Sequence, residues 1–240
     1  MYYPCAGTVG RRRVTVVAIH QPNYAPWLGY FHKIARSDVF VFLDNADYTK
    51  NSYINRVQIG DGSRPRWLTI PVSFRFGAPI NKVQPARSDW RRSHLDTLKS
   101  CYCKAPAFAA VWPRLKHMYD SLPDGNLAQS NRALIEMFAR EFGLKCAFLA
   151  ASEIDTGRLA ADNRLIAIVK AIAPHGTYLS GKGGKSYQDP SKFLSAGIGL
   201  VYSDFEHPVY DQKRDKCLSG LSVIDAIFHV GFAATAKFIV

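Results

Sequence analysis

The sequence predicts a single α/β domain in which a mostly parallel sheet is flanked by helices. Three observations predict this fold: two buried-type strand patterns near the N-terminus, a helical pattern between them, and a similar alternation further along the chain. The 240 residues suffice for one large domain, and 48% hydrophobic with 21% charged residues is typical of globular proteins. We expect this domain over residues 14–240, and a disordered extension over residues 1–13, which carry three arginines and no apolar period.

The first two strands are the clearest elements. Val14–Ile19 is a β-branched run of the kind that forms a strand buried on both faces. A turn rich in proline follows, and residues 27–36 then show helical spacing, with Pro26 at the first turn. The second strand is predicted at Val39–Leu43. Because a crossover through a helix is almost always right-handed, we expect the two strands to be parallel and adjacent.

The later elements follow from the hydrophobic period and from helix stop signals. The helix at 126–142 is well defined, because its apolar residues recur at helical spacing and Gly143 follows as a stop. The other predicted strands are 67–73, 80–83, 145–150, 177–180 and 198–205, and the other predicted helices are 90–102, 107–122, 158–173 and 222–230.

The positive charge is concentrated in one part of the chain. The formal net charge is +12, and residues 50–116 contain thirteen basic and only three acidic side chains. Such a segment favours an anionic partner: a nucleic acid, an acidic carrier protein, or a nucleotide or lipid-pyrophosphate substrate. A solvated basic face that only aids solubility is the alternative.

Cysteine and hydropathy patterns exclude several classes of protein. Five cysteines, an odd number, do not form a disulfide framework, and no second CxC or CxxC pair completes a zinc site with Cys101 and Cys103. We therefore expect no metal and no cofactor. The longest apolar runs are far too short to span a bilayer, and no export signal is recognisable, so we expect a cytoplasmic protein without membrane insertion.

Polar loops follow four of the predicted strands. Because ligands bind beyond the carboxyl ends of the strands in open α/β sheets, we expect these loops to line one cleft. A histidine at a strand end can bind an anion or transfer a proton, so His20 and His207 are the candidate catalytic residues. The alternative for each is a loop histidine bonded to the backbone. The candidate substrate-binding residues of these loops are Gln21, Asn23, Tyr24, Asp44, Ser180, Gly181, Lys182, Tyr187 and Tyr210.

Two further segments have a composition suited to phosphate binding. Lys50, Asn55 and Arg56 lie just past the second strand, where an arginine fork can hold a carboxylate or phosphate. Ser180–Ser186 (SGKGGKS) offers backbone amides and lysines. It does not match GxxxxGK[ST], so it is interpreted as a flexible ligand-contacting loop rather than a P-loop.

These residues together resemble the opening of the WbqC-like protein family. The opening motif is Val17–Phe31 (VAIHQPNYAPWLGYF), followed by Lys33 and by the strand ending at Asp44. Asn45–Asp47 departs from the Asp-Val-Gln usual at this point in the family. The resemblance continues, in order, through Lys50-Asn51, Asn55-Arg56, residues 67–72, residues 178–181, Tyr187, His207–Tyr210 and Leu221–Asp225.

The resemblance implies a role in bacterial O-antigen or related polysaccharide biosynthesis, where a glycine transferase activity has been suggested for the family. The chain would then move a glycyl or other acyl group onto an amino group of a nucleotide-linked sugar. Lys33 enters the candidate substrate site through this resemblance. The donor would be bound to an acidic carrier protein or to tRNA, or activated in another way.

Three functions stay open on the sequence. An acyl or aminoacyl transferase needs a base, for which His20 or His207 qualifies, and donors for the tetrahedral oxyanion. A nucleotidylyltransferase-like enzyme would use a histidine loop and a late lysine-serine motif, but the next histidine, His32, lies twelve residues after His20 rather than within one short motif. A non-catalytic nucleic-acid or carrier-binding protein would explain the charge but not the polar loops.

Overall fold

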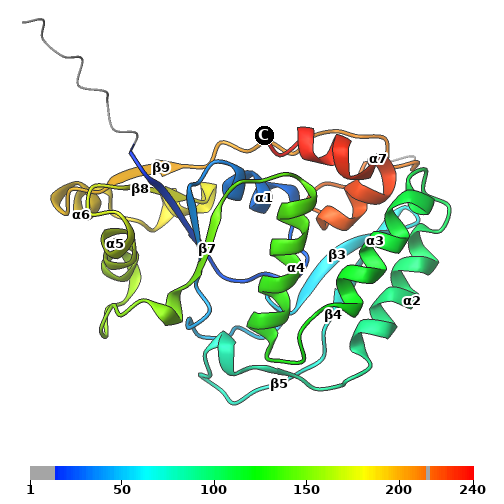
Figure 1. Ribbon diagram of the computed structural model, residues 1–240, viewed down its shortest axis with the longest axis horizontal. Coiled ribbons are helices and arrows are strands. Elements are labelled where there is room, and N and C mark those ends of the chain that lie inside the picture. Colours follow the sequence, from blue (N-terminus) through cyan, green and yellow to red (C-terminus); the bar gives the residue numbers. More distant parts are fainter. Residues whose placement is uncertain (1–13, 215–216) are drawn as a thin grey trace, which may run out of the picture.

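The fold is built on a five-stranded parallel sheet, seen in a computed structural model that describes residues 14–214 and 217–240 (Figure 1). The strand order is β7-β2-β1-β8-β9, and β1 pairs in parallel with both β2 and β8. The predicted α/β fold with adjacent first and second strands is therefore confirmed, while the predicted extension 1–13 lies outside the described residues. The strands are β1 Val16–His20, β2 Val39–Phe42, β7 Ala147–Ala150, β8 Thr177–Ser180 and β9 Gly199–Tyr202.

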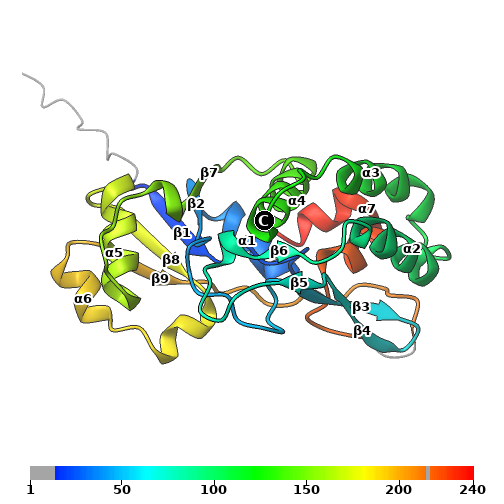
Figure 2. The ribbon, with the colours of Figure 1, turned by 90° about the horizontal axis from the view of Figure 1, so that it is seen from below.

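Helices cover both faces of the sheet, so the first two strands are buried on both sides. Helices α1 (Leu28–Ala35) and α4 (Leu127–Glu141) pack on the face that carries Ala18 and Phe40. Helices α5 (Ala161–Ile172) and α6 (Pro190–Ser195) pack on the opposite face (Figure 2). Two separate hydrophobic clusters result, one on each face of the sheet.

Beyond α1 and α4 the first cluster extends into a further layer of helices and a hairpin (Figures 1 and 2). The helices are α2 (Trp90–Tyr102), α3 (Phe108–Asp120) and α7 (Val223–Lys237), of which α7 bends at Gly231, where φ is +79°. The two-stranded elements are β3 Arg56–Asp61 with β4 Arg64–Thr69, and β5 Val72–Ser73 with β6 Gln84–Pro85.

Several element boundaries differ from the sequence prediction. The strand predicted at 80–83 is wrong, because Ile80–Lys82 forms a short 3-10 helix (η1) that buries Ile80. The strand predicted at 67–73 is split, since its first part closes the β3–β4 hairpin and its end forms β5. Two further 3-10 turns, η2 (Ala151–Glu153) and η3 (Lys182–Ser186), follow β7 and β8 directly.

The order in which the chain adds strands to the sheet reverses at β1. From β1 it proceeds outward to β2 and then β7, and it returns to the other side of β1 to add β8 and then β9. The connections to β2 and β7 place helices on one face, and those to β8 and β9 place helices on the other. Open α/β sheets bind ligands at the carboxyl ends of the two strands that flank such a reversal. From the topology we therefore expect a ligand-binding site at the carboxyl ends of β1 and β8.

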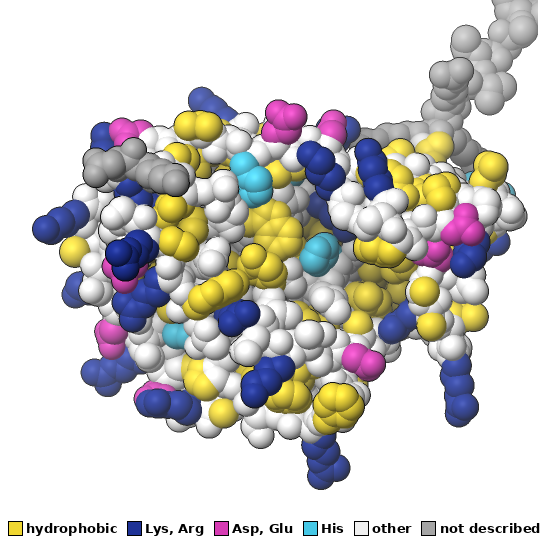
Figure 3. Space-filling view, turned by 180° about the vertical axis from the view of Figure 1, so that it is seen from behind, with side chains coloured by type: hydrophobic (Ala, Val, Ile, Leu, Met, Phe, Trp, Pro, Cys, Tyr) yellow, Lys and Arg dark blue, Asp and Glu magenta, His cyan; other side chains and the backbone are white. Residues whose placement is uncertain are grey.

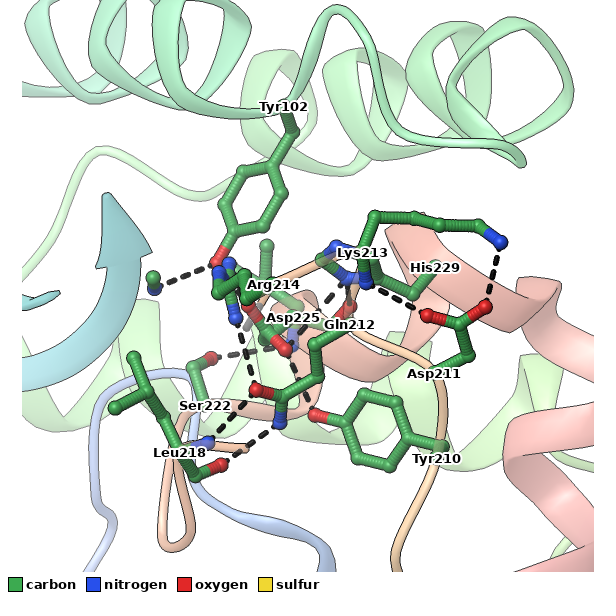
Figure 4. Close-up of polar contacts among 12 residues, drawn as sticks. Tyr102, Tyr210, Asp211, Gln212, Lys213, Arg214, Leu218, Ser222, Asp225 and His229 are labelled. Carbon is green, nitrogen blue, oxygen red and sulfur yellow. Dashed lines mark hydrogen bonds and ion pairs between the residues drawn. The ribbon is translucent and has the colours of Figure 1, made fainter. Parts of the chain in front are cut away.

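A buried charged cluster fixes the segment between β9 and α7 (Figure 4). Its centre is Asp225 on the first turn of α7, a side chain that solvent does not reach. The carboxylate accepts hydrogen bonds of 2.8 Å from Tyr102, from Tyr210 and from Arg214. Tyr102 in turn accepts the backbone N–H of Gly60 at 2.8 Å, so the cluster joins α2, the β3–β4 hairpin, the 203–222 segment and α7.

We expect Asp225→Asn to destabilise the protein by about 3 kcal/mol, because it leaves the buried guanidinium of Arg214 without its counter-charge. Urea unfolding followed by circular dichroism measures this loss. The matched control is Asp211→Asn, since Asp211 pairs with Lys213 where both side chains are largely exposed, and its loss should have little effect. Equal shifts of the two unfolding midpoints would contradict a stabilising role of the cluster.

Candidate functional site

Strands β1 and β8 separate at their carboxyl ends. The pairing between β1 and β2 extends to the end of β1, where His20 lies opposite Phe42. The pairing between β1 and β8 stops two residues earlier, where Ala18 lies opposite Leu179. The next carbonyl of β1 on this side, that of Ile19, accepts a hydrogen bond of 2.7 Å from Nζ of Lys33. An α1 side chain thus replaces a sheet bond at the point where the chain reverses.

Lys33 is a buried lysine, with only 3% of its surface exposed. Burial lowers the pKa of its amine from 10.5 to about 7, because the charged form loses its hydration. Its Nζ makes no ion pair within the described part of the chain. Lys33 therefore exchanges between the charged and the neutral amine near neutral pH.

His20 ends β1 as a neutral imidazole. Its Nδ1 lies 3.1 Å from the carbonyl oxygen of Gln21, which can only accept, so Nδ1 carries the hydrogen and Nε2 keeps its lone pair. Burial, and secondarily the charge of Lys33, lower the pKa of His20 to about 3. Its ring packs against Tyr30 and Trp27, at centroid distances of 4.8 and 6.0 Å. His20 thus offers a hydrogen-bond acceptor at the sheet edge.

The loop after His20 is held by hydrogen bonds to its backbone carbonyls. Tyr30 donates to the carbonyl of Gln21 at 2.9 Å, and Asn131 on α4 donates to that of Pro22 at 2.8 Å. Ser222 donates to the carbonyl of Ala25 at 2.6 Å, and Ala25 has a φ of +38°, unusual for alanine. The side chain of Asn23, in the same loop, is buried. Three distant elements therefore fix the path of this loop.

Tyr24 anchors the same loop in the core. Its hydroxyl lies 2.7 Å from Nδ1 of His94 and 2.5 Å from the hydroxyl of Tyr119, and all three groups are buried. Since Nε2 of His94 donates to the carbonyl of Thr69, Nδ1 is the acceptor, and a chain of hydrogen bonds runs from Tyr119 through Tyr24 to His94. Burial also lowers the pKa of His94, to about 4. The hydroxyl of Tyr24 is thus occupied by protein groups.

The second predicted histidine lies on the same side of the sheet as His20. The segment after β9 runs over α1, where the Phe205 ring packs 5.3 Å from that of His32 and 5.2 Å from that of His207. Gly29 makes room for this ring, because a Cβ there would lie 2.7 Å from Phe205 and 3.0 Å from the Trp27 indole nitrogen. Trp27, which packs against His20, and Phe205, which packs against His207, therefore both lie close to Gly29. His207 is exposed, although partial burial lowers its pKa.

The glycine-rich loop after β8 is open to solvent. Lys182, Lys185 and Tyr187 are exposed, and a Cβ added at Gly181 would meet no atom within 4 Å. Ser180 behaves differently, since it shares the face of Tyr178 and is buried next to Gly184 and Gln188. The loop begins where β8 ends, and its Lys185 ammonium lies 5.5 Å above the Tyr202 ring at the end of β9, whereas the Ser180 hydroxyl points to the other layer.

Asp44 belongs to the β2–β7 half of the edge. Its carboxylate accepts hydrogen bonds from the backbone and hydroxyl of Ser152, at 2.9 and 2.6 Å, and from Asn81 at 3.3 Å. Pockets of about 290 and 580 Å³ lie here, with Ser152 and Glu153 in both linings. Asp44 thus holds two loops together and itself lines the smaller pocket, in the β2–β7 half of the sheet.

The remaining predicted residues lie on or near the β3–β4 hairpin and α7. The Asn55 amide donates to the carbonyl of Ile70 at 3.1 Å, and the Arg56 guanidinium lies 4.1 Å above the Trp67 ring. Lys50 is exposed on the preceding turn, and Tyr210 is bonded to Asp225.

Sequence reasoning missed the aromatic residues around His20 and the Asp225 cluster. Trp27 and Asp225 occur in the motifs that carry the family resemblance but were assigned no role there, and Phe205 was not predicted at all. An aromatic residue directly after a proline-rich loop, as at Trp27, was the one local indication.

The face opposite to the view of Figure 1 shows hydrophobic and histidine side chains around a hollow, with lysines and arginines about it (Figure 3). Over residues 14–214 and 217–240, no group of three or more His, Cys, Asp or Glu side chains could hold a metal ion. Among these same residues, no helix has the length and hydrophobicity needed to cross a bilayer.

Comparison with known proteins gives one family and one relative. The model of the WbqC-like protein family matches residues 21–237. The relative is "Uncharacterized protein Rv1507c" of Mycobacterium tuberculosis (strain ATCC 25618 / H37Rv), which is 30% identical over 221 residues. The matched region covers 91% of this chain and 95% of that protein. The residues matched by the family model include the loop after β1, the β3–β4 hairpin and the Asp225 cluster.

The pH dependence of stability tests the burial of Lys33. Below about pH 7 its amine is charged in the folded and the unfolded chain, and the cost of burying that charge is present in full. Between about pH 7 and 10.5 the unfolded chain keeps a proton that the folded chain releases, so stability rises with pH. We expect Lys33→Met to raise the free energy of unfolding relative to wild type most strongly below about pH 7. This gain in stability should shrink as the pH rises from about 7 to 10.5.

Urea unfolding of both proteins across this pH range measures the difference. Lys170→Met, at an exposed position on α5, is the control and should change nothing with pH. A constant difference between Lys33→Met and wild type at all pH values would show that the folded pKa of Lys33 is normal.

Proposed function

The chain belongs to the WbqC-like protein family, and we propose that it is a transferase that moves a glycyl or other acyl group onto an amino group of a nucleotide-linked sugar or similar small acceptor. The observation that carries the proposal is the proximity of a neutral His20 and a buried Lys33 at the reversal point of the sheet. These two groups match the two needs of acyl transfer to an amine, which are an acceptor for an N–H and a cation near the carbonyl oxygen.

His20 would orient the attacking amine. An amine attacks only in its neutral form, and its N–H must then point at an acceptor while its lone pair faces the acyl carbon. Nε2 of His20 is such an acceptor, because its tautomer is fixed by the Gln21 carbonyl. With a pKa of about 3 this imidazole is a weak base, so its role in the proposal is to position the amine rather than to store its proton.

Lys33 would supply the charge. In its cationic form it lies close enough to His20 to lower the pKa of that ring, and it would stabilise the oxyanion that forms as the amine attacks. The new C–N bond forms, the bond from the acyl carbon to its carrier breaks, and the proton of the amine ends on the departing carrier group. His207, which is exposed next to the Phe205 ring, would exchange protons with solvent in this proposal.

Basic side chains on the loop after β8 support an anionic acceptor. Lys182 and Lys185 lie exposed on the loop after β8, and the open space at Gly181 lets a ligand approach the backbone. A nucleotide-linked sugar carries a diphosphate that would need such charges.

One observation favours a second candidate, a nucleotidylyltransferase-like enzyme. Doubly wound sheets commonly bind nucleotides at the reversal point, and here a lysine-rich loop follows β8 at that point. Calorimetric binding of ATP or CTP that is abolished by Lys185→Ala would favour this candidate over the transferase.

Glycine transfer to a nucleotide-linked amino sugar tests the proposal directly. The assay offers glycyl-tRNA, a glycyl thioester on a carrier protein and glycyl adenylate as donors. We expect product with one of them, and a loss of about 100-fold in kcat/KM for His20→Ala, since the amine loses its acceptor. His175→Ala is the matched control, because His175 is exposed on the loop before β8.

If His20→Ala binds the acceptor as tightly as wild type, the loss in kcat/KM comes from the acyl-transfer step and not from binding. Absence of product with all three donors, or equal activity of His20→Ala and wild type, would overturn the proposal.

A further inference from the structure

A chain of aromatic side chains leads from His20 to the outer face of the β3–β4 hairpin. The Trp27 ring lies 5.7 Å from that of Tyr53, and the Tyr53 ring lies 5.8 Å from that of Trp67. The Arg56 guanidinium lies 4.1 Å above the Trp67 ring. We call Trp27, Tyr53, Trp67 and Arg56 the aromatic strip.

The strip faces solvent at its outer end. Tyr53 is 43% and Trp67 39% exposed, so both aromatic side chains are partly open to solvent. In the hairpin, Trp67 pairs with Gln58, while Val57 and Ile59 point inward and are buried. Trp67 and Arg56 therefore lie on the outer face of the hairpin and not in the hydrophobic core.

Arg56 lacks a counter-charge. Within residues 14–214 and 217–240 its guanidinium forms no ion pair, and its Nε is buried without a hydrogen-bond partner. A buried donor without a partner costs stability unless a ligand supplies an acceptor. The segment from 50 to 116, to which Tyr53, Arg56 and Trp67 belong, contains thirteen basic and three acidic residues. An anionic ligand is thus favoured over a neutral one.

We propose that the aromatic strip binds single-stranded nucleic acid, with bases stacked on Tyr53 and Trp67 and a backbone phosphate on Arg56. Aromatic faces next to arginine are the usual means of holding a single strand, because every base has a face that can stack and every linkage carries a negative charge. The proposal stands on the strip alone and does not depend on the transferase activity.

Ring geometry favours a single strand over a duplex. Neighbouring rings are inclined to each other by 60° and 54°, so the strip offers separate faces rather than one flat platform. The bases of a single strand can turn individually onto such faces, whereas those of a duplex are stacked inside it. The inner end of the strip, Trp27, contacts His20, so a bound strand would have one end near the opening between β1 and β8.

Binding of a short fluorescent oligouridylate, followed by anisotropy at low and at physiological salt, tests the proposal. We expect Tyr53→Ala and Trp67→Ala each to weaken binding about tenfold, since each removes one stacking face. We expect Arg56→Gln to weaken binding and to lower its dependence on salt, because one phosphate contact is lost. Thermal melts of each variant check that the exposed substitutions leave the fold intact.

The chain supplies a matched pair of controls in Arg75 and Phe76. They place a cation beside a fully exposed aromatic ring in the same basic segment, but on the loop after β5 and outside the strip. Arg75→Gln and Phe76→Ala should leave the affinity unchanged. Equal losses in the control and strip variants would show that binding is only a diffuse effect of charge, and would overturn the proposal.

Other ligands give different outcomes. No binding of oligouridylate even at low salt, or a duplex bound as tightly as the single strand, would overturn the proposal. So would binding of a neutral oligosaccharide that is lost in Trp67→Ala while oligouridylate binding persists. UDP is compared as a mononucleotide. If it binds as tightly as oligouridylate and loses affinity in the same strip variants, the strip is a mononucleotide site, and the proposal of a single-stranded nucleic acid is overturned.

Discussion

The arrangement of the candidate site depends on the hydrogen bond between Lys33 and the carbonyl of Ile19. A strand at the centre of a parallel sheet must satisfy its backbone on both sides, and β1 pairs with β2 from Val17 to its end at His20. On the β8 side the pairing stops early, and a buried carbonyl without a partner would be costly. Lys33 supplies that partner from α1. The same bond thus permits the strands to separate and holds a buried amine at the gap.

Helix α4 and the start of α7 hold the loop that connects His20 to Trp27. Asn131 from α4 bonds both the Pro22 and the Ile54 carbonyls, and so ties the loop after β1 to the segment before β3. Ser222 at the start of α7 bonds the Ala25 carbonyl, and the Asp225 cluster in turn fixes the start of α7. Rigid positioning of a loop by polar side chains from several elements is what a site needs when its geometry must be maintained.

The sequence predicted the strands well because their burial leaves a strong local pattern. Both early strands are β-branched or aromatic runs, and the structure buries them on two faces. The β3–β4 hairpin was missed, although its two-residue turn contains Gly62, whose φ is +57°, because Arg64 and Arg66 break the apolar alternation of β4. The 80–83 segment has the composition of a strand but pairs with none, and tertiary contacts of Ile80 decide its conformation instead.

For the candidate site, the sequence could place residues at strand ends but could not show which way their side chains point. Ser180 ends β8, yet the alternation of the strand turns it to the opposite layer from His20. Asp44 and Tyr210 were candidates for ligand binding, but their polar groups are bonded to Ser152, Asn81 and Asp225. Both Asp44 and Asp225 are thus held by neighbouring groups, whereas Lys182 and Arg56 carry positive charge without an ion pair in the described residues. The charge left available around the opening of the sheet and along the aromatic strip is cationic, and this favours an anionic ligand at both places.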